Sequence, residues 1–179
     1  AVSDTQDLQD EIGGWSGNPH VYVRIEDLPR ARAWLESYEA NRKAERYRFL
    51  NQPHEAESIC RDVLAADPEN QLALRNLGLA ITDQFTGRPT DRAGEAERAI
   101  AQLKDKYENR YYSGIVYERL AKSQLAAGQM PHAVYGFLED ALECFKEAEA
   151  LRPPKNDDAL LHWNFCVRIL ESRPESEWQ

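Results

Sequence analysis

The sequence predicts an all-α protein, and two observations carry that prediction. From Leu28 onward, apolar residues recur at intervals of three and four, which is the period of a helix rather than the alternation of a strand. Short groups of Pro, Gly, Asn and Asp residues interrupt this period, as turn residues between helices do. Seven helices are predicted, at about residues 28–50, 53–66, 70–84, 92–107, 110–127, 131–151 and 157–171. Because the joints are short, neighbouring helices should run antiparallel.

Single residues set most of these boundaries. Residues 51–53 end with a proline and break the first helix, and Pro68 ends the second, because proline cannot extend a helix interior. Residues 86–91 form a predicted loop between the third and fourth helices. Gly128 ends the fifth helix, and the proline pair at 153–154 ends the sixth.

The two ends of the chain differ from the helical part. Residues 1–27 are predicted to form an irregular N-terminal segment, because they combine acidic residues with several glycines. Within it, residues 20–25 alternate apolar and polar like one short strand, which has no partner strand in the sequence. Residues 28–171 form the predicted helical domain, and residues 172–179 form a polar tail in which Trp178 is the apolar exception.

Composition disfavours several classes of protein. The net charge is -9 and the pI is about 5. Nucleic acid is therefore not an expected partner, since binding it needs a clustered basic face. No apolar run of about 18 residues and no signal-peptide pattern occur, so no membrane insertion is expected. A cytoplasmic location is expected, and processing of the N-terminus would leave the compartment open. Cys60, Cys144 and Cys166 are expected to be buried free thiols.

A spacing of small residues is the most informative pattern in the chain. Ala44 and Ala56 lie 12 residues apart, Pro68 follows after another 12, and Gly78 lies 34 residues after Ala44. A two-helix unit of 34 residues cannot bury its own apolar face and must stack on a neighbour. The spacing therefore predicts a stack of helical hairpins with an open groove.

This pattern resembles the tetratricopeptide repeat (TPR) family. The first unit, residues 37–70, matches the TPR motif at Ala44, Tyr47, Ala56 and Pro68, but has Cys60 where the motif has a large apolar residue.

Two later units match less closely. The second begins at Gln71 and has the pair Leu77-Gly78, while its Ala96 and Ile100 arrive six residues late. The third is placed with Ala121 as its small residue, and its second helix arrives eight residues late, with the motif residues Ala141, Phe145, Ala148 and Pro153. Ala133 lies at the regular distance and is followed by Phe137, so the register of this helix stays open. The resemblance implies a right-handed α-α superhelix of about three repeats with a C-terminal capping helix.

The resemblance also implies a function. TPR domains are non-catalytic modules that bind a peptide or partner protein in a concave groove, and the first helix of each pair lines that groove. On the register above, the expected partner-binding residues are Tyr38, Asn41, Glu45, Arg48, Leu72, Arg75, Asn76, Leu79, Glu118, Arg119 and Lys122. No cofactor or metal is expected. His162 and Cys166 share a helical face, but two ligands do not make a metal site.

Other hypotheses stay open at this stage. The protein could be a small acidic TPR chaperone for a secreted client, which would keep that client unfolded. It could also self-assemble, if residues 20–25 or Trp178 dock into a neighbouring copy. A closed helical bundle is the alternative fold, and an enzyme is the remaining alternative function.

Overall fold

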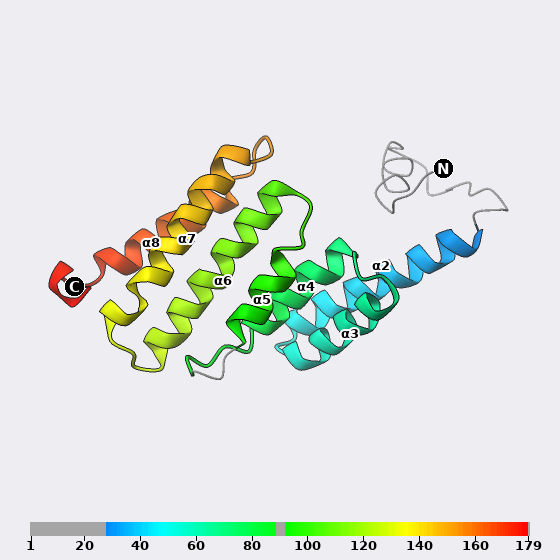
Figure 1. Ribbon diagram of the computed structural model, residues 1–179, viewed down its shortest axis with the longest axis horizontal. Coiled ribbons are helices and arrows are strands. Elements are labelled where there is room, and N and C mark those ends of the chain that lie inside the picture. Colours follow the sequence, from blue (N-terminus) through cyan, green and yellow to red (C-terminus); the bar gives the residue numbers. More distant parts are fainter. Residues whose placement is uncertain (1–27, 89–91, 179) are drawn as a thin grey trace. The chain divides into compact units, whose positions relative to one another are not determined.

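The computed structural model describes residues 28–88 and 92–178, whose regular elements are all helices, with no strand among them (Figure 1). The helices are α2 (Leu28–Phe49), α3 (Pro53–Ala66), α4 (Gln71–Thr82), α5 (Ala93–Ile100), α6 (Lys106–Ala126), α7 (Pro131–Leu151), α8 (Asp158–Glu171) and the 3-10 helix η2 (Glu175–Glu177). The all-α prediction is thus confirmed for this part of the chain. The predicted N-terminal segment, with the strand at residues 20–25, lies outside the described residues.

The chain divides into two units, Ala1–Ala40 and Asn41–Gln179, and the boundary falls within α2. Within the second unit, each helix from α3 to α8 packs against the next one along the chain. In addition, α4 contacts α6, and α6 contacts α8. The first helix of one hairpin therefore touches the first helix of the next.

Most helix boundaries agree with the prediction, but one turn was misplaced. Helix α5 ends at Ile100 and α6 begins at Lys106, whereas the sequence predicted one helix to residue 107 and the next from 110. The reason is a helix cap: the Asp105 carboxylate accepts a hydrogen bond from the Glu108 amide at 2.8 Å. The Asn109 side chain also donates to the Ile100 carbonyl at 3.1 Å, which fixes the turn between the two helices.

The small residues of the repeat pattern lie where two helices meet. Ala44, Ala56 and Ala96 are fully buried in one apolar cluster, together with Cys60 and Ile100. A Cβ atom added at Gly78 would lie 2.6 Å from the Ile100 Cδ1 atom, so only glycine allows this approach. The small residues of the pattern therefore allow neighbouring helices to approach closely.

The third hairpin repeats this contact in a different register. A Cβ atom added at Gly114 would lie 2.6 Å from Phe145 Cε1, as at Gly78 and Ile100. The sequence placed the small residue of this unit at Ala121, which is buried but lies seven residues later. The close approach thus falls two helical turns before the expected position. Helices α6 and α7 extend past it to residues 126 and 131.

Two connecting segments fold against this longer hairpin. Gly87 has a φ of 74°, and a Cβ atom there would lie 2.6 Å from the Ala127 Cβ atom. At the C-terminus, the predicted polar tail contains η2, and Trp178 is only 8% exposed. The Trp178 indole nitrogen donates to the Leu170 carbonyl at 3.0 Å, and its ring lies 6.2 Å from that of Tyr135. The Trp178 side chain is therefore already used within its own chain.

We predict that Gly78→Ala lowers the free energy of unfolding by about 1–3 kcal/mol, because the new methyl group overpacks a fully buried contact with Ile100. Chemical denaturation measures the change. Adding Ile100→Val, which removes the clashing Cδ1 atom, should restore part of the loss.

Gly136→Ala is the matched control for this experiment. Gly136 is an exposed residue of α7, and nothing lies within 4 Å of a Cβ atom built there. The control should raise stability by about 0.5–1 kcal/mol, since alanine is the better helix former. Equal effects of the two alanines would contradict the packing argument.

Candidate functional site

The partner-binding residues predicted from the sequence lie on α2, α4 and α6, and many of them contact one another. Arg75 of α4 is the centre of a first row. Its guanidinium lies 3.2 Å from the Glu45 carboxylate of α2 and 3.1 Å from the Glu108 carboxylate of α6. It also lies 5.9 Å above the ring of Tyr112. Arg75 therefore links three helices, and its two carboxylate partners leave this row with one net negative charge.

A second row follows near the C-terminal ends of the same helices. Asp83, which caps α4, accepts a hydrogen bond from Arg48 Nε of α2 at 2.6 Å. Its other oxygen pairs with Arg119 of α6, whose guanidinium also donates to the Thr82 hydroxyl at 2.7 Å. Here one aspartate joins two arginines, so the row carries one net positive charge.

Two asparagines of the predicted site are buried between helices. Asn41 is 2% exposed and donates to the Asn70 side-chain oxygen at 3.1 Å. That same oxygen accepts the Ala73 amide and caps α4. Asn76 is 1% exposed and donates to the Asn41 carbonyl at 3.5 Å. These side chains therefore fix helix positions rather than face a ligand.

The apolar members of the predicted set differ in exposure. Leu79 is 8% exposed and belongs to a second apolar cluster, which also contains Ile115, Val134 and Phe145. Leu72 is half-buried and belongs to neither of the two main clusters. Tyr38 is also half-buried and lies in the part of α2 before the unit boundary.

A third polar group joins α6 to α8. Glu118 is 3% exposed, and one of its carboxylate oxygens lies 2.6 Å from His162 Nδ1 of α8. Its other oxygen accepts from Lys122 Nζ at 3.4 Å. The Lys122 ammonium also lies 4.7 Å from the ring centre of Phe165. The repeat pattern predicts Glu118 in the groove but gives no signal that His162 is its partner.

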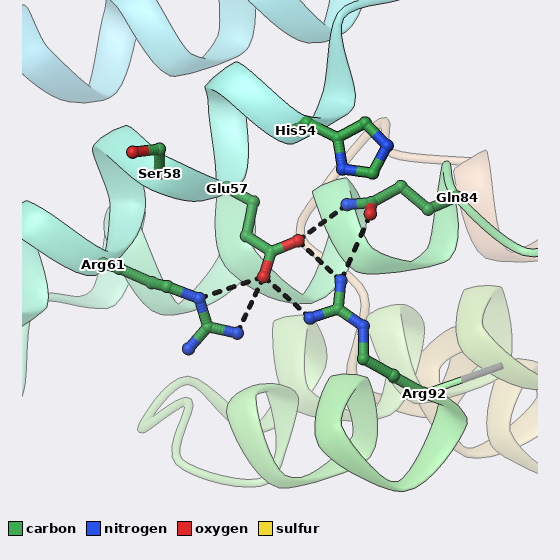
Figure 2. Close-up of a pocket in the computed structure, with 6 residues that line it drawn as sticks. All are labelled: His54, Glu57, Ser58, Arg61, Gln84 and Arg92. Atoms are coloured by element: carbon green, nitrogen blue, oxygen red, sulfur yellow. Dashed lines mark hydrogen bonds and ion pairs between the residues drawn. The ribbon is translucent and has the colours of Figure 1, made fainter. Parts of the chain in front are cut away.

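A surface pocket of about 470 Å³ lies on the second helices of the hairpins, away from the predicted set (Figure 2). At its centre the Glu57 carboxylate of α3 accepts hydrogen bonds from Arg92 at 2.6 Å, from Arg61 at 2.7 Å and from Gln84 at 2.7 Å. His54 and Ser58 complete the lining. No sequence motif pointed to this pocket.

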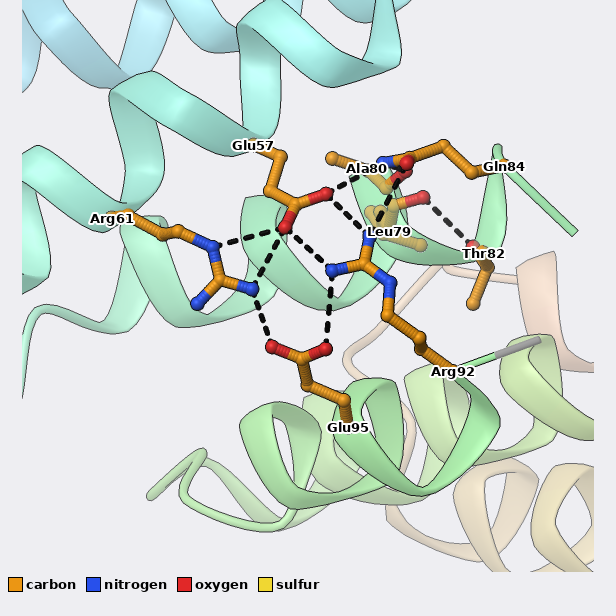
Figure 3. A network of polar contacts seen from close by, with 8 residues as sticks. All are labelled: Glu57, Arg61, Leu79, Ala80, Thr82, Gln84, Arg92 and Glu95. Carbon is orange, nitrogen blue, oxygen red and sulfur yellow. Dashed lines mark hydrogen bonds and ion pairs between the residues drawn. The ribbon is translucent and has the colours of Figure 1, made fainter. Parts of the chain in front are cut away.

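The charges in this pocket balance. Figure 3 shows that Glu95 of α5 pairs with both Arg61 and Arg92, so two carboxylates face two guanidinium groups. The hydrogen bond from Arg92 is the main cause that lowers the pKa of Glu57 from 4.5 to about 2. Glu57 and Glu95 already neutralise Arg61 and Arg92. These side chains therefore hold α3 and α5 together and leave no net positive charge to bind an anion.

Chemical reactivity has little support among the described residues. Burial raises the pKa of the Cys60 and Cys166 thiols to about 12, which removes the thiolate that a nucleophile requires. Within residues 28–88 and 92–178, no group of three His, Cys, Asp or Glu residues is placed to hold a metal ion. In the same residues, no helix has the length and apolar character needed to cross a bilayer.

Comparison with known proteins adds no relative. No protein-family model matches the chain, and neither the curated proteins nor the solved structures give a significant match.

We predict that Glu57→Gln destabilises the protein by about 1–3 kcal/mol at neutral pH, because it removes the charge that neutralises Arg61 and Arg92. A carboxyl with a lowered pKa stabilises the fold above its unfolded value of 4.5, and this contribution is lost as the pH falls towards about 2. The difference between wild type and variant should therefore shrink between pH 4.5 and pH 2.

Denaturant titrations across this pH range measure the effect. Glu139→Gln is the control, since Glu139 is an exposed residue within α7. It should change stability by less than about 0.5 kcal/mol. A Glu57→Gln effect that does not depend on pH would contradict the role assigned to the carboxylate.

Proposed function

We propose that the chain is a TPR-like helical repeat module, a right-handed α-α superhelix that binds a peptide or a partner protein without catalysing a reaction. One observation carries the proposal: several ion pairs between successive hairpins join residues that are 33 to 36 positions apart. The pairs Arg48–Asp83, Glu57–Arg92 and Glu69–Lys104 are each 35 residues apart. This separation is close to the 34 residues that the spacing of small residues predicts.

Links of similar separation are what stacked equivalent units produce. When each hairpin repeats the previous one, a contact between two units joins residues about one repeat apart. The links occur on both sides of the hairpins, because Arg48 lies on a first helix and Glu57 on a second helix. A closed bundle would instead bring the first and last helices together, with contacts at many separations.

In such a stack, the first helices α2, α4 and α6 share one face, which is the proposed binding surface. Its row around Arg75 is net negative and its row around Asp83 is net positive. A bound segment with a basic group towards the first row and an acidic group towards the second would match both. Leu72 and Lys122 are the predicted site residues best placed for contact, since one is half-buried outside the main clusters and the other is exposed.

We predict that the double variant Leu72→Ser/Lys122→Ala binds its partner about threefold to tenfold less than wild type, since it removes an apolar and a cationic contact. Tagged protein would be used to capture partners from native extract, and the amount of each co-eluting protein would be measured for both forms. Arg75 and Arg119 are left unchanged, because both arginines hold helices together.

The matched control is Leu151→Ser/Lys146→Ala, which removes the same two side-chain types from α7. Leu151 is 47% exposed, and among the described residues Lys146 pairs only with Glu143 of its own helix. Circular dichroism would check that both variants keep their helix content. A partner that binds all three forms equally would reject this face as the binding site.

A further inference from the structure

Helix α8 carries an exposed strip of four residues that begins and ends with opposite charges. Asp158, Leu161, Phe165 and Arg168 follow one another at intervals of three, four and three, so they lie on one side of the helix. Leu161 is 56% exposed and Phe165 is 37% exposed. We call these four residues the α8 strip. Two large apolar side chains thus stand next to each other on the surface.

Neither charge of the α8 strip has an ion-pair partner in the part of the chain that the structure describes, although Asp158 lies in the first turn of α8 and Arg168 in its last turn, where the helix dipole favours each of them. Asp158 and Arg168 are both exposed, and neither side chain has an ion pair within residues 28–88 and 92–178. Most other arginines of the described chain behave differently, since Arg48, Arg75 and Arg119 all pair with carboxylates. A surface that binds the α8 strip should therefore carry apolar residues between one basic and one acidic group.

The order of residues in the α8 strip is self-complementary. The midpoint of Asp158 and Arg168 is position 163, and this is also the midpoint of Leu161 and Phe165. If a second α8 lies antiparallel across this midpoint, each aspartate meets an arginine and each leucine meets a phenylalanine. The spacing of three, four and three is also that of positions a and d in a helix pair, where antiparallel partners place a opposite d.

We propose that the α8 strip binds the same strip of a second copy, which forms a two-fold symmetric dimer. In this dimer Asp158 faces Arg168 of the partner subunit, and Leu161 packs against Phe165 of the partner subunit. The same contacts occur twice because the axis relates the two helices. The proposal does not depend on partner binding by the first helices, since it uses only α8.

The size of the contact sets its strength. One helix from each copy gives an interface at the small end of the range for specific complexes, so the dimer should be weak and depend on concentration. Lys122 stands beside Phe165 and could add contact at the edge, but it has no equivalent at the Asp158 end. Lys122 is therefore left unchanged in the test.

The decisive experiment uses two opposite charge reversals in the full chain. Asp158→Arg leaves two positive charges on the strip, and Arg168→Asp leaves two negative charges. Each variant alone should lose self-association by at least about tenfold, because like charges then face each other across the axis. An equimolar mixture of the two should associate again, since every positive end meets a negative end. Sedimentation velocity from about 10 μM to about 1 mM would measure this.

Two further variants control for folding and for surface choice. Asp158→Arg/Arg168→Asp swaps the charges within one chain and should self-associate like wild type, which excludes misfolding as the cause of a loss. Leu161→Ala should weaken the dimer, whereas Leu160→Ala should not, because Leu160 is 42% exposed on another side of the same helix. A wild-type protein that stays monomeric at about 1 mM, a mixture that does not associate, or equal effects of the two alanines would each overturn the proposal.

Discussion

Close approach of helices at small residues is the contact on which the rest of this structure depends. Ile100 is fully buried because Gly78 has no side chain, and Phe145 occupies the same kind of space beside Gly114. A hairpin held together in this way still has an apolar face on each side, which the next hairpin must cover. The order of contacts along the chain, from α3 to α8, follows from that requirement.

Once the helices lie this close, long charged side chains reach from one hairpin to the next. Arg75 therefore bridges Glu45 and Glu108, and Asp83 holds both Arg48 and Arg119. Each exposed ion pair contributes little stability by itself, but a shared partner fixes the position of three helices at once.

This use of charges changes what the proposed binding face offers a ligand. A ligand that paired with Arg75 or Arg119 would first have to separate it from a carboxylate, which costs part of the energy gained. Contact with an apolar side chain such as Leu72 has no such cost. Leu72 is therefore a better candidate than Arg75 for the centre of the interaction, although the sequence pattern ranks them equally.

Sequence reasoning succeeded where one residue decides the outcome. Helices α3 and α7 begin at the predicted prolines, because proline is favourable in the first turn and unfavourable further along. The turn before α6 contains neither glycine nor proline, so its signal was only the cap from Asp105 to the Glu108 amide.

The register of the longer third hairpin could not be predicted from the sequence, for a different reason. Two extra turns preserve the helical period, so the period alone does not reveal that the close approach to Phe145 falls at Gly114 and not at the predicted Ala121. The pairing of Glu118 with His162 joins residues 44 apart and follows from that longer hairpin. The burial of Trp178 likewise depends on the extended part of α7, since its ring lies beside Tyr135.

The charges of the α8 strip also decide the geometry of the proposed dimer. In a parallel pair of helices, Asp158 would face Asp158 of the partner subunit, and the two Arg168 side chains would face each other, so like charges would oppose that arrangement at both ends. The antiparallel pair has no such conflict and closes on itself, because a two-fold axis uses the same surface of both copies. Apolar contact alone would not distinguish the two orientations, since leucine and phenylalanine pack well in either. The charged ends therefore favour the antiparallel dimer over the parallel one.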